Sequence, residues 1–475
     1  MRAAILLAGL AILMAGVMLP PPAGLSAAGL VTLAVLCTMA LWWFTEALPV
    51  TATALLPFVV LPLAGAGKVG EVAASYMAPV IFLVLGGALL ALAMEKWGLH
   101  RRIAVAVVRR AGSTPRGLIL GFMIATAAIS MAVSNTATTL IMMPIAISVL
   151  ATLLPAREQC SAAQLGFSAA LILGVAYSAS IGGLGTLIGS PTNGIAVGII
   201  DRTLGIEITF ARWMAFGLPL VIVSIPLAWW LLTRVAWRFE LGAFDRQQLL
   251  EAIGPQGPWN SGERRLLPVL GVAIAAWITL PLLQELPALA ALDDAVIAIL
   301  AALMLFVIPV RSSNGKIDTL LSWRETERAP WDVLLLFGGG LALADAITRT
   351  GLGSWLGQQL SALGGMPVLL FVVLVVGTVI LVTEFASNVA AAASFIPVIA
   401  GVTATMDIDP LVLILPAAFA ATWGFMMPAG TPPNAIAFAT GYLRVSQMIR
   451  AGFWIDLLGL LLIPAMIPLL LTLYA

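Results

Sequence analysis

Apolar runs about as long as a membrane-spanning helix fill most of this 475-residue chain. Charged residues make up only 9% of the sequence, whereas a soluble domain carries roughly 25%. The chain must bury its apolar surface in lipid and against itself, which predicts an all-α polytopic membrane protein. The apolar segments are 4–19, 27–44, 47–66, 78–96, 117–152, 165–200, 213–233, 266–283, 291–310, 331–348, 366–404, 411–441 and 452–474.

Two segments, 117–152 and 366–404, are too long for one crossing and too short for two. Each has a Ser-Asn pair in its middle, and we interpret both as re-entrant helical hairpins. About eleven transmembrane crossings then remain. With the N-terminus inside, nineteen of the 23 Lys and Arg residues fall on the inner side, as the positive-inside rule requires. We therefore expect a cell (inner or plasma) membrane protein with a cytoplasmic N-terminus, an external C-terminus, an inward-opening first hairpin and an outward-opening second one.

The chain also repeats itself. Four short motifs recur in the same order 253 residues later, and a fifth recurs after 241 residues. The pairs are Gly86-Gly87 with Gly339-Gly340, Gly98-Leu99 with Gly351-Leu352, Ser134-Asn135 with Ser387-Asn388, Pro144 with Pro397, and Gly189-Ser190-Pro191-Thr192-Asn193 with Gly430-Thr431-Pro432-Pro433-Asn434. We interpret them as a gene duplication, with a first repeat at 1–240, a cytoplasmic linker at 241–265 and a second repeat at 266–475. The predicted topology inverts one copy relative to the other, which is typical of secondary transporters.

Polar side chains cluster at the hairpin tips. Ser130, Ser134, Asn135 and Thr136 lie within seven residues of otherwise apolar sequence. Serine and threonine can bond back to helix carbonyls, so these residues could serve packing alone. An asparagine amide needs several partners, and its recurrence at Asn388 favours a binding site.

The fifth motif interrupts an apolar span in each copy. Pro191 and Pro432 each remove a backbone donor, and Gly189 permits unusual backbone angles. A broken helix at membrane depth is tolerated only where its backbone is buried or lines a cavity. Its free carbonyls suit a small alkali cation, whereas helix N-termini attract anions. Neither hairpin core and neither break contains Lys or Arg, so the pattern predicts a cation-coupled anion carrier.

Several motifs resemble the divalent anion/sodium symporter family, and in particular dicarboxylate transporters of the INDY type. They are the run Trp43-Phe44-Thr45-Glu46-Ala47-Leu48-Pro49, the run Lys96-Trp97-Gly98-Leu99-His100-Arg101-Arg102, the Ser134-Asn135-Thr136 signature and the two Gly-Ser/Thr-Pro-x-Asn loops. The resemblance covers nearly the whole chain and implies a homodimer that moves its substrate by an elevator motion. The scaffold spans would be 1–100 and 266–348, and the hairpins with the broken spans 165–200 and 411–441 would form the transport domain.

The resemblance also implies site residues. One sodium site would use Ser130, Ser134, Asn135 and Gly189, and the other Thr383, Ala386 (by its carbonyl), Asn388 and Gly430. The substrate would contact Asn135, Thr136, Ser190, Asn388, Val389, Thr431 and Pro432. Val389 stands where many relatives have threonine, which removes a hydrogen bond worth roughly 0.5–1.5 kcal/mol and adds an apolar wall.

The predicted function is sodium-coupled symport of four-carbon dicarboxylates such as succinate, malate or fumarate. The alternatives are a sodium-independent dicarboxylate or citrate exchanger, a sulfate symporter and, more distantly, an intramembrane enzyme. We expect no catalytic residues and no organic cofactor, because His100 has no evident catalytic partner and the intramembrane acids form no dyad. A carboxyl at membrane depth could relay a proton, but Glu384 is expected instead to have a structural, hydrogen-bonded role. The net charge of +1 indicates no nucleic-acid partner.

Overall fold

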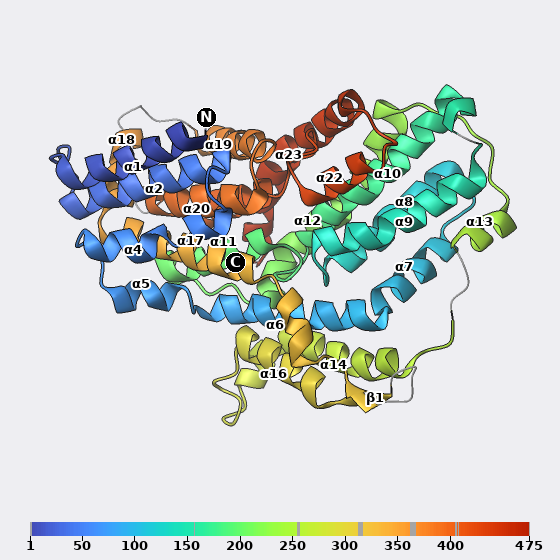
Figure 1. Ribbon diagram of the computed structural model, residues 1–475, viewed down its shortest axis with the longest axis horizontal. Helices are drawn as coiled ribbons and strands as arrows, with labels where there is room; N and C mark the ends of the chain where they lie inside the picture. Colours follow the sequence, from blue (N-terminus) through green and yellow to red (C-terminus); the bar gives the residue numbers. More distant parts are fainter. Residues whose placement is uncertain are drawn as a thin grey trace.

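The chain folds into a predominantly helical assembly (Figure 1). The computed structural model describes residues 2–155, 157–253, 257–311, 317–361, 367–403, 406 and 408–474. Within these ranges, seven helical stretches are long and apolar enough to cross a membrane, and seven further apolar helices are shorter. The prediction of a polytopic helical membrane protein is confirmed at this level, whereas the number of about eleven crossings stays a prediction.

The first half of the chain contains most of the long helices. Its elements are α1 (Arg2–Met18), α2 (Ala27–Thr45), α3 (Val50–Thr53), α4 (Leu56–Leu63), α5 (Val69–Ser75), α6 (Pro79–Trp97), α7 (Leu99–Arg110), α8 (Pro115–Ser130), α9 (Asn135–Leu153), the 3₁₀ turn η1 (Arg157–Gln159), α10 (Ala162–Gly183), α11 (Pro191–Leu204), α12 (Phe210–Trp230), the π-helical turn η2 (Leu231–Ala236) and α13 (Arg246–Ile253).

The second half repeats the series of hairpin and broken span. Its elements are α14 (Ser261–Ile278), α15 (Leu280–Gln284), α16 (Asp294–Val307), β1 (Pro309–Arg311), β2 (Ile317–Thr319), the 3₁₀ turn η3 (Trp323–Arg328), α17 (Trp331–Arg349), α18 (Leu352–Ser361), α19 (Val368–Thr383), α20 (Asn388–Thr403), α21 (Leu411–Ala420), α22 (Pro432–Ala439) and α23 (Val445–Tyr474). The linker predicted at 241–265 therefore contains α13 and the first turn of α14.

Both predicted hairpins consist of two helices joined by a short break. The first is α8 and α9 around residues 131–134, and the second is α19 and α20 around residues 384–387. Each broken span is likewise two helices, since seven residues (184–190) separate α10 from α11 and eleven residues (421–431) separate α21 from α22. The polar and Gly/Pro interruptions in the sequence therefore mark the ends of real helices.

Some elements differ from the sequence-based expectation. The apolar segment 47–66 is divided into two short helices, α3 and α4, because Pro57 stands in the first turn of α4 and Pro62 near its end. The strands β1 and β2 pair antiparallel, with Val310 opposite Asp318, and add a short two-stranded ribbon to an otherwise helical fold.

The repeated Gly-Leu pairs mark two further helices that hydropathy did not reveal. Gly98 and Gly351 have φ angles of 75° and 74°, a left-handed conformation that favours glycine. Each ends a buried helix, α6 or α17, and leads into the amphipathic α7 or α18. On α7, Val105 and Val108 are buried, whereas Arg110 is exposed.

Helix α10 is the centre of the fold. Every residue from Gly166 to Gly183 is buried, and many of them are Gly, Ala or Ser, which let neighbouring backbones approach closely. Helices α8, α9, α12 and α22 pack around it, and Figure 1 shows α8, α9 and α10 side by side.

The two halves of the chain interlock. The second arm of the first hairpin, α9, packs against α22 of the second half. The second arm of the second hairpin, α20, packs against α11 of the first half, and α17 joins this contact. In Figure 1 the labels α11, α17 and α20 accordingly lie together. Each half therefore completes the surroundings of the other half's broken span.

Candidate functional site

The first hairpin tip gathers oxygen atoms around one amide. The hydroxyl of Ser130 lies 2.7 Å from the carbonyl of Ala179 and 2.7 Å from the amide oxygen of Asn135. A hydroxyl has one proton to donate, so one of these contacts leaves two oxygens facing each other. With the amide turned over, its nitrogen would instead donate to Ser130 at 2.7 Å, Ala179 at 2.9 Å and Gly189 at 3.3 Å. In either orientation, oxygens from two helices and the α10–α11 break surround this side chain.

The second hairpin tip has the same arrangement. The hydroxyl of Thr383 lies 2.9 Å from the carbonyl of Ala421 and 2.7 Å from the amide oxygen of Asn388. The turned amide would donate to Thr383 at 2.7 Å, Gly430 at 3.1 Å and Ala421 at 3.3 Å. The pairs Ser130–Asn135 and Thr383–Asn388 are separated by the 253-residue interval found in the sequence. The recurrence therefore reflects one hydrogen-bonding design used twice.

A second asparagine in each copy braces the broken helix. The amide nitrogen of Asn193 donates to the carbonyls of Gly183 at 2.8 Å and Thr186 at 2.7 Å. The amide nitrogen of Asn434 donates to Gly424 at 3.3 Å and to Met427 at 3.1 Å. All of these partners obey the 241-residue interval. Carbonyls freed by the helix break are thus held in place by a side chain from the following helix.

The two breaks are attached to their hairpins by different chemistry. In the first copy, the hydroxyl of Thr186 donates to the carbonyl of Met131. In the second copy, the position equivalent to Met131 is Glu384, whose buried carboxylate accepts the N–H groups of Phe425 at 2.5 Å, Met426 at 2.9 Å and Met427 at 2.7 Å. Glu384 is therefore hydrogen-bonded, as expected, and it links the second hairpin to the second helix break.

The two broken spans meet through hydroxyl groups, a contact that the repeat did not reveal. The hydroxyl of Thr192, at the start of α11, lies 2.6 Å from that of Thr422, which follows α21. Ser190 lies next to it, with its hydroxyl 2.9 Å from Thr192. All three side chains are buried. The 241-residue interval pairs Thr422 with Ile181, so the repeat gave no signal that pointed to this contact.

The remaining predicted site residues differ from one another in burial and in hydrogen bonding. Ser134 is exposed, and its hydroxyl caps α9 by accepting the N–H of Ala137 at 3.3 Å, away from the Ser130–Asn135 contact. Thr431 is buried and caps α22 through the N–H of Asn434 at 3.2 Å, whereas Pro432 is exposed in the first turn of α22. Ala386 is buried, and Thr136 and Val389 are half-buried beside their asparagines.

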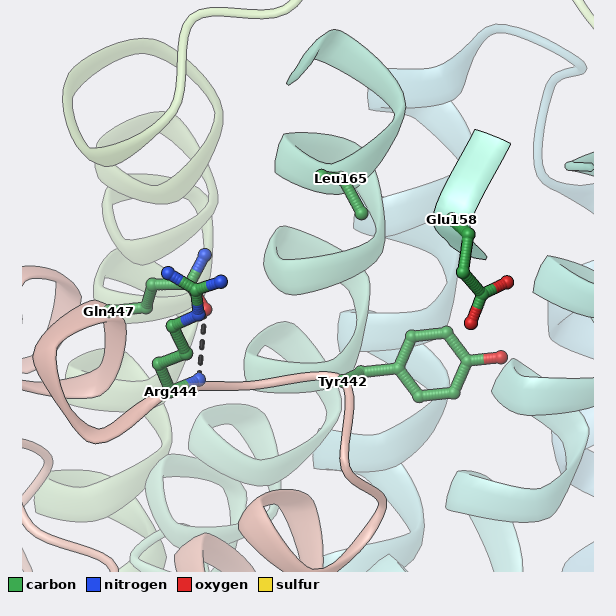
Figure 2. Close-up of a pocket in the computed structure, with 5 residues that line it drawn as sticks. All are labelled: Glu158, Leu165, Tyr442, Arg444 and Gln447. Atoms are coloured by element: carbon green, nitrogen blue, oxygen red, sulfur yellow. Dashed lines mark hydrogen bonds between the residues drawn. The ribbon is translucent and has the colours of Figure 1, made fainter. Parts of the chain in front are cut away.

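A cavity of about 410 Å³ lies elsewhere on the molecule (Figure 2). Its lining residues are Glu158, Leu165, Tyr442, Arg444 and Gln447. They come from η1, from α10, from the segment before α23 and from the first turn of α23. None belongs to a hairpin tip or a helix break, so this cavity is not the site that the motifs predict.

Comparisons with known proteins agree with this architecture. Residues 1–472 match the family described as the sodium:sulfate symporter transmembrane region. A sodium-dependent dicarboxylate transporter of Staphylococcus saprophyticus is 39% identical over 447 residues, which are 93% of this chain and 86% of that protein. Its counterpart in Staphylococcus aureus is 39% identical over 441 residues, 92% of this chain and 84% of that one.

Two solved transporter structures share the fold. The Alcanivorax borkumensis YdaH transporter superposes with a TM-score of 0.57 at 15% identity, covering 88% of this chain and 89% of its own. The Neisseria gonorrhoeae MtrF protein superposes with a TM-score of 0.59 at 12% identity, covering 98% and 94%. The family match over nearly the whole chain confirms the resemblance seen in the motifs: this protein belongs to the sodium:sulfate symporter family of divalent anion/sodium symporters.

Proposed function

We propose that this protein is a secondary active transporter that couples the uptake of four-carbon dicarboxylates to sodium. The observation that supports it best is the paired design of the hairpin tips. Each tip presents hydroxyl, amide and backbone oxygens around Asn135 or Asn388 without a lysine or arginine. The relatives named as sodium-dependent dicarboxylate transporters supply the cation and the class of substrate.

The oxygen clusters suit two sodium ions. When the amide oxygen of Asn135 points inward, it faces the oxygens of Ser130, Ala179 and Gly189. These oxygens repel one another, but each would be attracted to a cation bound among them. Asn388 faces Thr383, Ala421 and Gly430 in the same way. Hard, neutral oxygen ligands favour an alkali cation over a transition metal. In our proposal Ser134 and Ala386, the other predicted sodium ligands, contribute only through backbone oxygens, since the Ser134 hydroxyl is used as a cap.

The substrate would lie between the tips. Helices α9, α11, α20 and α22 all begin at the breaks, and helix N-termini attract a carboxylate through free N–H groups and the helix dipole. Ser190, Thr136 and Thr431 would add hydroxyl contacts, and Val389 would present an apolar wall. Because no basic side chain is available at the tips, bound sodium would balance part of the dianion's charge.

The wider architecture is part of the same proposal. We infer inverted repeats that share one midplane site, a transport domain that moves as an elevator against a scaffold, and a homodimer. The N-terminus would be cytoplasmic and the C-terminus external. The interlocking of α9 with α22 and of α20 with α11 supports a shared site, because the second arm of each hairpin packs against the broken span of the other copy.

Uptake of labelled succinate into proteoliposomes tests the coupling. An inward sodium gradient should drive accumulation, and replacing sodium by choline or potassium should abolish it. Equal uptake in all three salts, stimulated by internal dicarboxylate, would instead establish exchange. Competition by malate, fumarate, citrate and sulfate then ranks the anions.

Substitution of the tip asparagines tests the site. Asn135→Ala and Asn388→Ala should each abolish uptake while the protein remains folded, because each removes the amide at the centre of an oxygen cluster. Asn260→Ala is a matched control, since Asn260 caps α14 far from the tips. Full transport by both tip variants would contradict the proposed site.

A further inference from the structure

Three buried hydroxyl groups connect the first helix break to the second half of the chain. The hydroxyl of Thr192 lies 2.9 Å from that of Ser190 and 2.6 Å from that of Thr422. The exposed fractions of Ser190, Thr192 and Thr422 are 3%, 0% and 1%, so bulk water is not a partner for them. Each hydroxyl has one proton to donate. The direction of the hydrogen bonds along this chain therefore depends on which end has another acceptor.

The Thr422 end of the chain has no other acceptor. Thr422 follows α21, and within the described parts of the protein its hydroxyl has no hydrogen-bond partner besides Thr192. Its neighbours in the sequence, Ala421 and Trp423, are both fully buried, which places this hydroxyl in the packed interior. A buried hydroxyl that donates to nothing forfeits a hydrogen bond, so Thr422 donates to Thr192.

Thr192 then has one proton and two candidate acceptors. The Ser190 oxygen lies at 2.9 Å, whereas the amide oxygen of Asn193 lies at 3.4 Å, beyond the range of roughly 2.5–3.0 Å for an O–H···O hydrogen bond. The equivalent amide oxygen of Asn434 has no partner among the described residues, so the fold tolerates an unbonded oxygen at this position. The shorter contact therefore receives the proton. The Ser190 oxygen accepts from Thr192, and the proton of Ser190 is left for a further acceptor.

The second copy reaches the same state with a different donor. Thr431 stands 241 residues after Ser190, and Pro433 stands 241 residues after Thr192. Proline has no hydroxyl, and the hydroxyl of Thr431 instead accepts the N–H of Asn434 at 3.2 Å. In both copies an internal donor thus occupies the hydroxyl oxygen and leaves the hydroxyl proton unused. Two such hydroxyls suit a ligand whose oxygens only accept, as those of a carboxylate do.

We propose that Thr422 is a positioning residue for the anion: through Thr192 it orients the hydroxyl of Ser190 as a hydrogen-bond donor to a substrate carboxylate. This role rests on the proposed function, in which Ser190 contacts the dicarboxylate. Thr422 lies in the second half of the chain and Ser190 in the first, so one half determines an anion contact made by the other. Without the Thr422 hydroxyl, Ser190 donates to the freed Thr192 oxygen, and the substrate must compete for that proton.

Succinate binding to the full-length protein in detergent, measured by titration calorimetry in saturating sodium, tests this role. Thr422→Val removes the hydroxyl at nearly constant volume and should weaken binding about three- to tenfold, the range expected for one hydrogen bond. Thr422→Ser keeps the hydroxyl and should bind like the wild type. Thr233→Val is the matched control and should also bind like the wild type, because Thr233 is equally buried but donates only to the carbonyl of Trp229, one turn earlier.

A double-mutant cycle separates positioning from packing. In a Ser190→Ala background, Thr422→Val should cause no further loss of succinate affinity, because the hydroxyl that it orients is gone. Thr422→Cys supplies a weaker donor and should show an intermediate loss, and it serves in the cycle if Thr422→Val does not fold. Additive losses in the cycle, wild-type affinity in Thr422→Val, or an equal loss in Thr422→Ser or Thr233→Val would overturn the proposal.

Failure of the proposed function gives a different result. If the wild-type protein binds sulfate or citrate but not succinate, the proposed substrate class is wrong. The same cycle run with the anion that binds still decides the role of Thr422, because the oxygens of these anions are also acceptors. A wild-type protein that binds none of the three anions would overturn both proposals.

Discussion

The brace formed by Asn193 can be removed with a predictable cost. Its amide nitrogen donates two short hydrogen bonds, at 2.8 Å to Gly183 and at 2.7 Å to Thr186, in a fully buried position. Asn193→Ala leaves the Gly183 carbonyl buried without that donor, whereas the Thr186 carbonyl keeps the N–H of Gly189 at 3.3 Å. One unsatisfied buried group costs about 1–3 kcal/mol and one lost hydrogen bond about 0.5–1.5 kcal/mol, so the variant should lose about 1.5–4.5 kcal/mol of unfolding free energy. Gly189, a proposed sodium ligand, lies in the same loop, so the variant should also take up less substrate.

The equivalent variant in the second copy should be milder. Asn434 donates at 3.3 Å and 3.1 Å, at or beyond the long end of the normal range, and its own amide oxygen is buried without a partner in the described structure. Asn434→Ala therefore sacrifices weaker bonds and removes one unsatisfied atom. We expect about half the loss of Asn193→Ala or less.

Unfolding of detergent-solubilised protein with a denaturing detergent measures these differences, and Asn193→Asp provides the discriminating control. The carboxylate has nearly the size of the amide but replaces its donor by an acceptor, which would face two carbonyl oxygens. Asn193→Asp should therefore be less stable than Asn193→Ala. If the aspartate variant equals or exceeds the alanine variant in stability, the brace does not act through its N–H groups and the reasoning is wrong.

Two further predictions concern other parts of the molecule. Gly183→Ala should abolish uptake, because an added Cβ would overlap the amide oxygen of Asn135; Gly242→Ala, with open space around it, should transport normally. Burial alone would raise the pKa of Glu325, but hydrogen bonds led by that from Lys96 lower it below its ordinary value of 4.5. The stability from this pair is present above that ordinary value and is lost as the pH falls through the lowered pKa; melting curves across acidic pH should show the loss, and Lys96→Met should weaken that pH dependence.

Local signals in the sequence located much of the candidate site. A helix in lipid ends only where something replaces its backbone hydrogen bonds, so Ser134-Asn135 and Pro191 identified real helix ends. The recurrence of Asn193 as Asn434 predicted two similar breaks. In the structure, each asparagine donates to two carbonyls at equivalent positions of its own copy.

Other features depend on packing that no local pattern encodes. Thr192 meets Thr422 across the two halves, and only the folded chain brings these hydroxyls to 2.6 Å. The amphipathic α7 escaped the hydropathy pattern because its arginines lower the mean hydropathy while one apolar face stays buried.

Each copy links its hairpin to its broken helix, but the two copies use different chemical groups for this link. Position 131 is tied to the first break by the hydroxyl of Thr186, which brings no charge. The equivalent position 384 is tied to the second break by a carboxylate. A carboxylate close to the second oxygen cluster attracts a cation there more strongly than the uncharged groups attract one at the first cluster. The three N–H groups that bind the carboxylate weaken this attraction in part. Under the proposed function, the two cation sites should therefore differ in strength, and the site around Asn388 should fill at the lower sodium concentration.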